Sequence, residues 1–171
     1  MKIVLVGYMG SGKSTVAKLL ANAMKLKFLD LDNYIEQRLG SKIPIIFKER
    51  GELFFRKKEH EYLKCILDNE NDLVLSVGGG TPCYAGNMDS IIEKADAVFY
   101  LKVSLPVLVQ RLSKEKENRP LIKNIPDEDL PEFIGKHLFE RSFYYSQATY
   151  KVLCDKKEPK TIVDEIQSLF I

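Results

Sequence analysis

The sequence predicts an α/β fold, with a parallel β-sheet covered by helices on both faces. Five short apolar or β-branched runs without strict alternation are typical of strands buried on both faces. They occupy residues 3–6, 26–29, 73–77, 97–103 and 150–154. Helical patterns separate these runs, and such alternation indicates parallel strands joined by right-handed crossovers. The chain has 171 residues and 45% hydrophobic content, which suits one domain with one core, residues 1–171.

The first predicted strand leads into a phosphate-binding loop. Residues 7–14 read G-x-x-x-x-G-K-S, and apolar residues at helical spacing follow as far as Lys25. In such a loop the backbone N–H groups and the helix start face phosphate oxygens, Lys13 reaches the terminal phosphates, and Ser14 holds Mg²⁺. A chance glycine-rich turn is the alternative. The strand before the loop and the helix after it favour phosphate binding.

The connection between the second and third strands, residues 30–72, is much longer than the first crossover, which indicates a functional insertion. Three helical segments are predicted in it: residues 33–39, ended by Gly40; a short segment from Pro44 to Gly51; and residues 52–67.

Further helices are predicted beyond the third strand. Asn87 is expected to cap one of them, and Ser104 followed by Pro106 is typical of another helix start. A final helix that holds Ile162 and Phe170 is expected to close the domain.

Residues 113–126 are charged and broken by prolines, so we expect a mobile surface segment there. The apolar stripe of the next helix, residues 130–138, includes His137. We interpret His137 as a partly buried structural residue, because no nucleophile or carboxylate partner is evident beside it.

Asp30 and Asp32 stand at the carboxyl end of the second strand, the edge where open α/β sheets bind ligands. Strand alternation would place both carboxylates on one face. One could hold Mg²⁺, directly or through water, and the other could orient or deprotonate an attacking hydroxyl. A solvated turn or a helix cap is the alternative, and the nearby phosphate-binding loop favours function.

Gly78-Gly79-Gly80 follows the third strand and would let backbone approach a ligand closely. A flexible loop is the alternative, and the position at the same sheet edge favours a binding floor. Many phosphate-loop proteins place an acidic residue at the end of this strand, where this chain has Ser76-Val77. The metal carboxylate must come from elsewhere, which points to Asp30.

Three arginines are candidates, although most arginines are solvated surface residues. Arg56, in the insertion, could bind a substrate carboxylate in bidentate fashion. Arg119, in the charged segment, could swing over a transferring phosphoryl group, or be an ordinary exposed residue. Arg141 could be a second carboxylate ligand or only a charge at a helix C-terminus, and spacing does not decide between these.

The composition argues against several other classes. A net charge of +2 gives no reason to expect nucleic acid or an anionic membrane as partner. Cys65, Cys83 and Cys154 are widely spaced and indicate ordinary thiols in a reducing compartment. No signal peptide or membrane-spanning stretch is evident, so we expect a cytoplasmic protein.

Taken in order, these motifs resemble those of the shikimate kinase family along nearly the whole chain. They are residues 7–15, Asp30-Leu31-Asp32 with Glu36-Gln37-Arg38, Gly51-Glu52 with Phe55-Arg56, Gly78-Gly79-Gly80, Arg119-Pro120-Leu121, and Glu140-Arg141 before a tyrosine. The resemblance implies a fold of the P-loop nucleoside monophosphate kinase type, a three-layer sandwich whose five-stranded parallel sheet has the order 2-3-1-4-5. It also implies a substrate-binding insertion, residues 33–60, and a lid, residues 113–126.

The resemblance further implies a monomeric enzyme that transfers the γ-phosphoryl group of ATP, with Mg²⁺, to the 3-hydroxyl of shikimate. Asp32 would activate that hydroxyl, and shikimate would be bound by Arg56, Arg141 and Gly79. Lys13 and Arg119 would stabilise the phosphoryl group. The ATP-binding residues would be Gly10, Ser11, Gly12, Lys13, Ser14, Thr15, Arg111 and Arg119, with Arg111 packed against adenine. Ser14 would bind Mg²⁺ directly and Asp30 through water.

One departure from the family pattern lies after Arg141, where the proline is missing and Tyr144-Tyr145 stands in place of a single tyrosine. Which of the two tyrosines corresponds to the family tyrosine is open.

A gluconate-type or nucleotide-type kinase would share the sheet and the loop, and the D-x-D, F-R and G-G-G combination favours shikimate. A nucleotide-dependent switch should carry N-K-x-D and D-x-x-G motifs, which are absent. A non-catalytic relative should have lost the lysine, the acidic pair or the lid arginine, and all are present.

Overall fold

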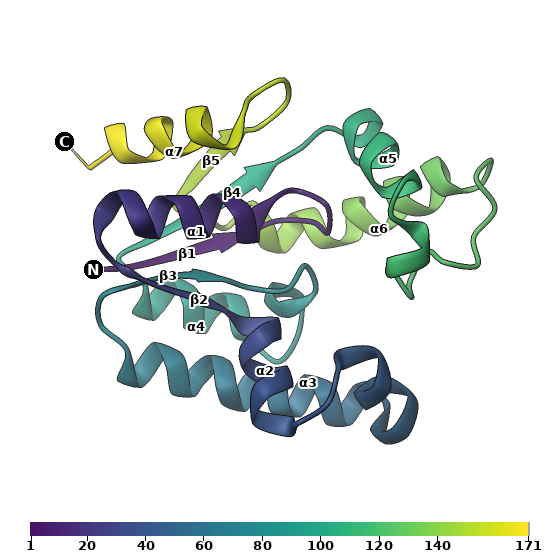
Figure 1. The fold of residues 1–171 in the computed structure, drawn as a ribbon, viewed down its shortest axis with the longest axis horizontal. Helices are drawn as coiled ribbons and strands as arrows, with labels where there is room; N and C mark the ends of the chain where they lie inside the picture. The colour runs from purple at the N-terminus through teal and green to yellow at the C-terminus, as the bar shows by residue number, and fades with distance from the viewer. Residues whose placement is uncertain (171) are drawn as a thin grey trace.

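The computed structural model describes residues 1–170 and has one five-stranded parallel sheet in the order β2-β3-β1-β4-β5 (Figure 1). The strands are β1 (Lys2–Val6), β2 (Lys27–Asp30), β3 (Leu73–Ser76), β4 (Ala97–Lys102) and β5 (Tyr150–Leu153). The predicted strands and strand order are confirmed, with ends that differ by one residue.

The central strand, β1, lies between β3 and β4. Val4 pairs with Leu75 on one side and with Val98 on the other. These side chains are at most 1% exposed, because helices cover both faces of the sheet. Because the strands are buried on both faces, their sequences are continuous apolar runs.

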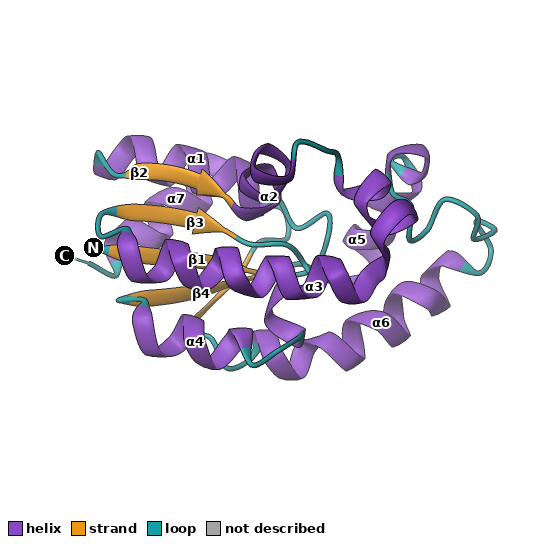
Figure 2. Ribbon diagram, turned by 90° about the horizontal axis from the view of Figure 1, so that it is seen from below, coloured by secondary structure: helices purple, strands orange, loops and turns teal. Residues whose placement is uncertain are grey.

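The helices form two layers (Figure 2). The layer with α1 (Lys13–Met24) and α7 (Pro159–Ser168) covers one face of the sheet, and the layer with α3 (Ile43–Asn69) and α4 (Asn87–Lys94) covers the other. Among residues 1–170, no helix is both long enough and apolar enough to cross a bilayer.

The long connection after β2 consists of α2 (Leu31–Leu39) and α3. Gly40 ends α2 with φ 65°, as predicted. Within α3, Gly51 has φ 84° and ψ 168°, so the helix is interrupted at the predicted position. Only glycine adopts this conformation readily.

Short 3₁₀ turns lie over Thr81–Cys83, between β3 and α4, and over Lys116–Asn118, after α5 (Leu105–Ser113). Helix α6 (Leu130–Tyr145) precedes β5. The prediction that Asn87 caps α4 is wrong: Gly86 is the N-cap residue, and the Asn87 side chain is buried. Residues 113–126 are not purely a surface segment, because the Ile122 side chain is fully buried in the core.

Candidate active site

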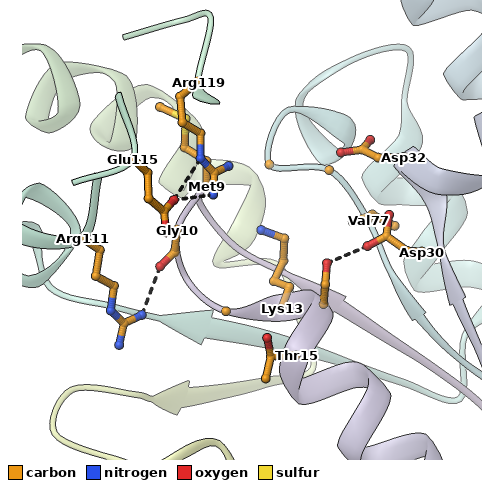
Figure 3. Close-up of a pocket in the computed structure, with 14 residues that line it drawn as sticks. Met9, Gly10, Lys13, Thr15, Asp30, Asp32, Val77, Arg111, Glu115 and Arg119 are labelled. Carbon is orange, nitrogen blue, oxygen red and sulfur yellow. Dashed lines mark hydrogen bonds and ion pairs between the residues drawn. The ribbon is translucent and has the colours of Figure 1, made fainter. Parts of the chain in front are cut away.

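A cavity of about 400 Å³ opens at the carboxyl ends of the strands (Figure 3). It is large enough for a small ligand. Most of the predicted site residues line it: Gly10, Gly12, Lys13, Ser14, Thr15, Asp30, Asp32, Gly79, Arg111 and Arg119. Ser11, Arg56 and Arg141 are not among its lining residues.

The phosphate-binding loop is shaped by glycines in left-handed conformations. Gly10 has φ 78° and Gly12 has φ 87°. Gly12 is the N-cap residue of α1 and supplies no capping side chain. The first N–H groups of α1 therefore have no side-chain acceptor at the cap, and they are suited to bind phosphate oxygens.

The Lys13 side chain is only 8% exposed and lies inside this loop. Its Nζ donates to the carbonyl oxygen of Tyr8 at 3.0 Å and to Ser11 Oγ at 3.5 Å. Burial lowers the pKa of Lys13 to about 8, and the charge on Asp32 opposes that change. Ser11 is only 3% exposed, so its hydroxyl oxygen is a buried acceptor for the lysine.

Asp30 serves as both a helix cap and a site residue, which were alternatives in the sequence. Its Oδ1 accepts the backbone N–H of Asn33 at 3.1 Å and so caps α2. Its Oδ2 accepts the Ser14 hydroxyl at 2.6 Å. A carboxylate and a hydroxyl brought together in this way are ligands of the kind Mg²⁺ prefers.

Asp32 faces the cavity for a different reason from the predicted one. It lies in the first turn of α2, so strand alternation does not apply to it. Its Oδ1 lies 3.0 Å from where a Cβ at Gly78 would be, so a side chain at that position would press on the carboxylate. Burial raises the pKa of Asp32 to about 6, helped by the charges of Asp30 and Glu59 and opposed by Lys13.

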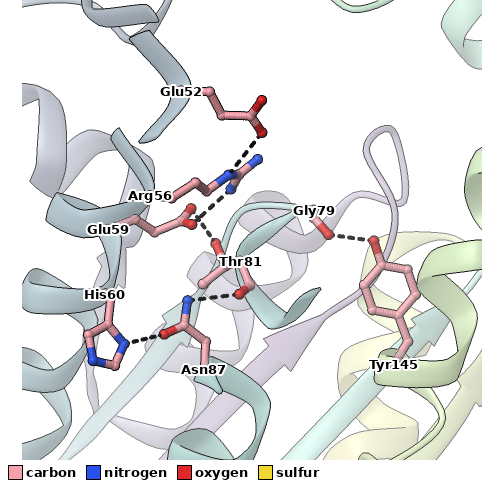
Figure 4. A network of polar contacts seen from close by, with 8 residues as sticks. All are labelled: Glu52, Arg56, Glu59, His60, Gly79, Thr81, Asn87 and Tyr145. Carbon is pink, nitrogen blue, oxygen red and sulfur yellow. Dashed lines mark hydrogen bonds and ion pairs between the residues drawn. The ribbon is translucent and has the colours of Figure 1, made fainter. Parts of the chain in front are cut away.

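Arg56 is held by a carboxylate, Glu59, that was not among the predicted site residues (Figure 4). Its Nη1 donates to Glu59 Oε1 at 2.8 Å, and Glu59 is only 1% exposed. The second oxygen of Glu59 accepts the Thr81 hydroxyl at 2.8 Å. The Arg56 Nε lies 3.6 Å from Glu52 Oε1, an ion pair without a hydrogen bond. The i,i+3 spacing of Arg56 and Glu59 was the signal available in the sequence.

The network continues into α4. The buried Asn87 amide donates to the carbonyl oxygen of Thr81 at 2.9 Å, and its oxygen lies 2.7 Å from His60 Nδ1. This explains why Asn87 does not cap the helix. A buried amide must satisfy its own donors and acceptors, and here it fixes the turn after the glycines.

Arg56 and Arg141 both approach the glycine segment. A Cβ at Gly80 would lie 2.7 Å from the Arg56 guanidinium, and a Cβ at Gly79 would lie 3.4 Å from Arg141 Nη1. Gly80 therefore leaves space that Arg56 uses, whereas Arg141 lies at ordinary van der Waals distance from the Cβ position of Gly79. Arg141 is 8% exposed.

Tyr145 connects α6 to the same segment. Its hydroxyl donates to the carbonyl oxygen of Gly79 at 2.5 Å, and its side chain is fully buried (Figure 4). Tyr144 is partly exposed, and among residues 1–170 no hydrogen bond involves its hydroxyl. By position and contact, Tyr145 is the tyrosine that belongs to the site.

Arg111 and Arg119 stand across the cavity from Asp30 and Asp32 (Figure 3). Arg111 Nη1 donates to the carbonyl oxygen of Gly10 at 3.0 Å. Arg119 is 36% exposed and donates through Nε and Nη2 to Glu115 Oε2, at 3.2 and 2.8 Å. Glu115 also lines the cavity and was not among the predicted residues.

Comparison with known proteins identifies the same family. The family model for shikimate kinase matches residues 9–170. A shikimate kinase of Flavobacterium psychrophilum is 49% identical over 169 residues, which cover 98% of each chain. A shikimate kinase of Flavobacterium johnsoniae is 46% identical, over 98% of this chain and 96% of that protein.

Two solved structures are similar in fold as well. The shikimate kinase of Bacteroides thetaiotaomicron has a TM-score of 0.90 at 35% identity, over 98% of this chain and 97% of that one. The shikimate kinase of Acinetobacter baumannii, in complex with shikimate, has a TM-score of 0.89 at 32% identity, over 98% and 91% of the chains.

Proposed function

The chain belongs to the shikimate kinase family, and on that premise we propose that it transfers the γ-phosphoryl group of ATP to the 3-hydroxyl of shikimate. One observation carries the proposal: a single cavity has a phosphate-binding loop on one side and the Asp32 carboxylate, free for an alcohol, on another. A kinase requires that combination, because the acceptor hydroxyl must meet the γ-phosphoryl group in line.

The phosphate-binding loop forms the nucleotide half of the site. Its N–H groups bind the phosphates of ATP, and Lys13 contributes positive charge inside the loop. Arg111 borders the loop at Gly10 and packs against adenine. Arg119 leaves Glu115 to neutralise charge on the transferring group. The exchange of partners is easy because the Arg119–Glu115 pair is partly exposed.

Asp32 acts on the acceptor hydroxyl. It accepts the proton as the hydroxyl oxygen attacks phosphorus, and a pKa near 6 suits a group that must be charged at neutral pH and still accept a proton. Arg56 and Arg141 bind the substrate carboxylate. The Gly79 backbone lines the cavity and contacts the substrate ring there.

Ser14 and Asp30 would hold Mg²⁺, which they fit as a hydroxyl and a carboxylate already in contact. When bound, the ion neutralises charge on the phosphates.

We further propose that residues 33–60 form the substrate-binding insertion and residues 113–126 a lid. Arg56 lies in the first segment and Arg119 in the second, and each donates to a carboxylate of its own segment, Glu59 or Glu115. The protein is proposed to act as a cytoplasmic monomer.

The test compares ADP release with shikimate, gluconate and a nucleoside monophosphate in parallel. Shikimate is expected to stimulate ATP turnover, and the other two acceptors are not. Stimulation by gluconate or the nucleoside monophosphate alone would replace shikimate with that acceptor class.

Asp30→Asn tests the magnesium assignment. The asparagine keeps the oxygen that caps α2, so the fold is retained, while the charge beside Ser14 is lost. The Mg²⁺ concentration that gives half-maximal rate is expected to rise about tenfold. Asp89→Asn, an exposed residue in the first turn of α4, is the control and should leave that concentration unchanged. An unchanged Mg²⁺ dependence in Asp30→Asn would remove Asp30 from the site.

A further inference from the structure

One hydrogen bond joins the phosphate-binding loop directly to α6. The Tyr8 hydroxyl and His137 Nδ1 lie 2.8 Å apart, and the two rings meet edge to face with centroids 5.4 Å apart. Tyr8 is 1% exposed. The His137 ring also packs against the Phe133 ring, with centroids 5.5 Å apart. Both rings are therefore fixed in place.

Tyr8 contacts residues of both halves of the site. Its carbonyl oxygen accepts hydrogen bonds from Lys13 Nζ at 3.0 Å and from the backbone N–H of Ser11 at 3.2 Å. The guanidinium carbon of Arg141 lies over the Tyr8 ring, 6.0 Å from the ring centroid. His137 precedes Arg141 by four residues on α6, so the two side chains lie on one side of that helix.

The charge states suit a lasting hydrogen bond. Burial, together with the Arg141 charge, lowers the pKa of His137 to about 4, so the imidazole is neutral near pH 7 and Nδ1 can accept. Burial raises the pKa of Tyr8 to about 12, so the phenol keeps its proton and donates. Arg141 is left as the cation of this cluster.

We propose that Tyr8 and His137 are positioning residues that hold Arg141 in place for the substrate carboxylate. A long arginine side chain loses conformational freedom when it binds a ligand, and an arginine held in advance loses less. The Tyr8 ring supplies that support, and the bond to His137 keeps the ring from turning away. The inference rests on the proposed role of Arg141 in binding shikimate.

Two substitutions test the bond. Tyr8→Phe removes the donor, and His137→Phe removes the acceptor while keeping a ring. Each is expected to raise the KM for shikimate about fivefold, with kcat and the KM for ATP changed less than about twofold. The double variant should be no worse than either single variant, because both remove the same bond. His137→Asn places an amide oxygen near the position of Nδ1 and should restore part of the affinity.

Tyr144→Phe is the matched control. It also removes a phenolic hydroxyl, but the Tyr144 hydroxyl makes no hydrogen bond within residues 1–170. Its constants should equal those of the unmodified protein. An unchanged KM for shikimate in both Phe variants would overturn the inference, as would equal losses for both substrates, which indicate only a disturbed loop. An unmodified protein that does not phosphorylate shikimate would instead overturn the proposed function, and this inference with it.

Discussion

Asp32→Asn is expected to lower kcat by a factor on the order of a thousand while ATP binds within about threefold of its normal affinity. The amide has nearly the shape of the carboxylate but cannot accept the proton of the attacking hydroxyl. Among residues 1–170, no hydrogen bond or ion pair joins Asp32 to the phosphate-binding loop, so the nucleotide half should be preserved. Single-turnover rates and calorimetric titration with a non-hydrolysable ATP analogue measure the two quantities separately.

The same substitution is expected to stabilise the folded protein. The pKa of Asp32 is about 6 in the folded protein against an ordinary value of 3.8, so the folded state binds the proton more tightly than the unfolded state. The native carboxylate therefore lowers the free energy of unfolding as pH rises from about 4 to about 6, and the deficit persists above that range. Removing the charge should therefore raise the free energy of unfolding by about 1–2 kcal/mol at pH 7.5, which corresponds to a rise of about 3–6 °C in Tm.

Asp89→Asn is a matched control, because it also removes a carboxylate from the first turn of a helix. It should leave kcat unchanged and should not raise Tm, since an exposed acid in that position favours the helix dipole. The difference in Tm between Asp32→Asn and the unmodified protein should disappear as pH falls from about 6 towards 4. A lower Tm at neutral pH, or a loss of ATP affinity as large as the loss of kcat, would contradict the assigned role.

Much of the fold could be predicted because a parallel sheet covered on both faces requires continuous apolar strands. Each such run is short, and the segments between are too long for hairpins. The break at Gly51 was also predictable, because glycine is the residue that tolerates φ 84°. The burial of Ile122 was not, since one apolar residue among charges and prolines shows no period.

The candidate site was predictable where residues adjacent in sequence act together. The phosphate-binding loop is such a case, since one turn and one helix start create it. Asp32 was expected beside Asp30 for a wrong reason: α2 begins at Leu31, two residues before the predicted helix start at residue 33. A capping carboxylate at Asp30 sets that early start, and the same residue bonds to Ser14.

Contacts between distant segments could not be predicted. Glu59 and Thr81 are 22 residues apart, and Tyr8 and His137 are 129 apart. Nothing in either segment indicates which side chain of the other it meets, because the packing of whole helices decides it. His137 is partly buried, as the sequence indicated, and it has a partner in the phosphate-binding loop that the sequence did not indicate.

Lys13→Met is expected to impair both ATP binding and phosphoryl transfer, whereas Asp32→Asn should impair only the transfer. Methionine keeps most of the buried volume of the lysine and removes its charge. We expect kcat to fall by about a thousandfold, because no other cation in the described chain replaces Lys13 inside the loop, and ATP affinity to fall at least about tenfold. Stopped-flow measurement of phosphoryl transfer and calorimetric titration with ATP check the two losses.

Lys18→Met is the matched control, since Lys18 is exposed on the same helix. It should behave as the unmodified protein. Lys13 is buried with a pKa lowered to about 8, so the folded state already bears a cost for its charge at pH 7, and Lys13→Met should not lower Tm. If Lys13→Met loses activity while its Tm is unchanged, the loss is therefore due to the missing positive charge and not to unfolding. If ATP affinity stays normal in Lys13→Met while kcat falls, the lysine acts only on the transferring group, and the binding of ground-state phosphates belongs to the backbone N–H groups.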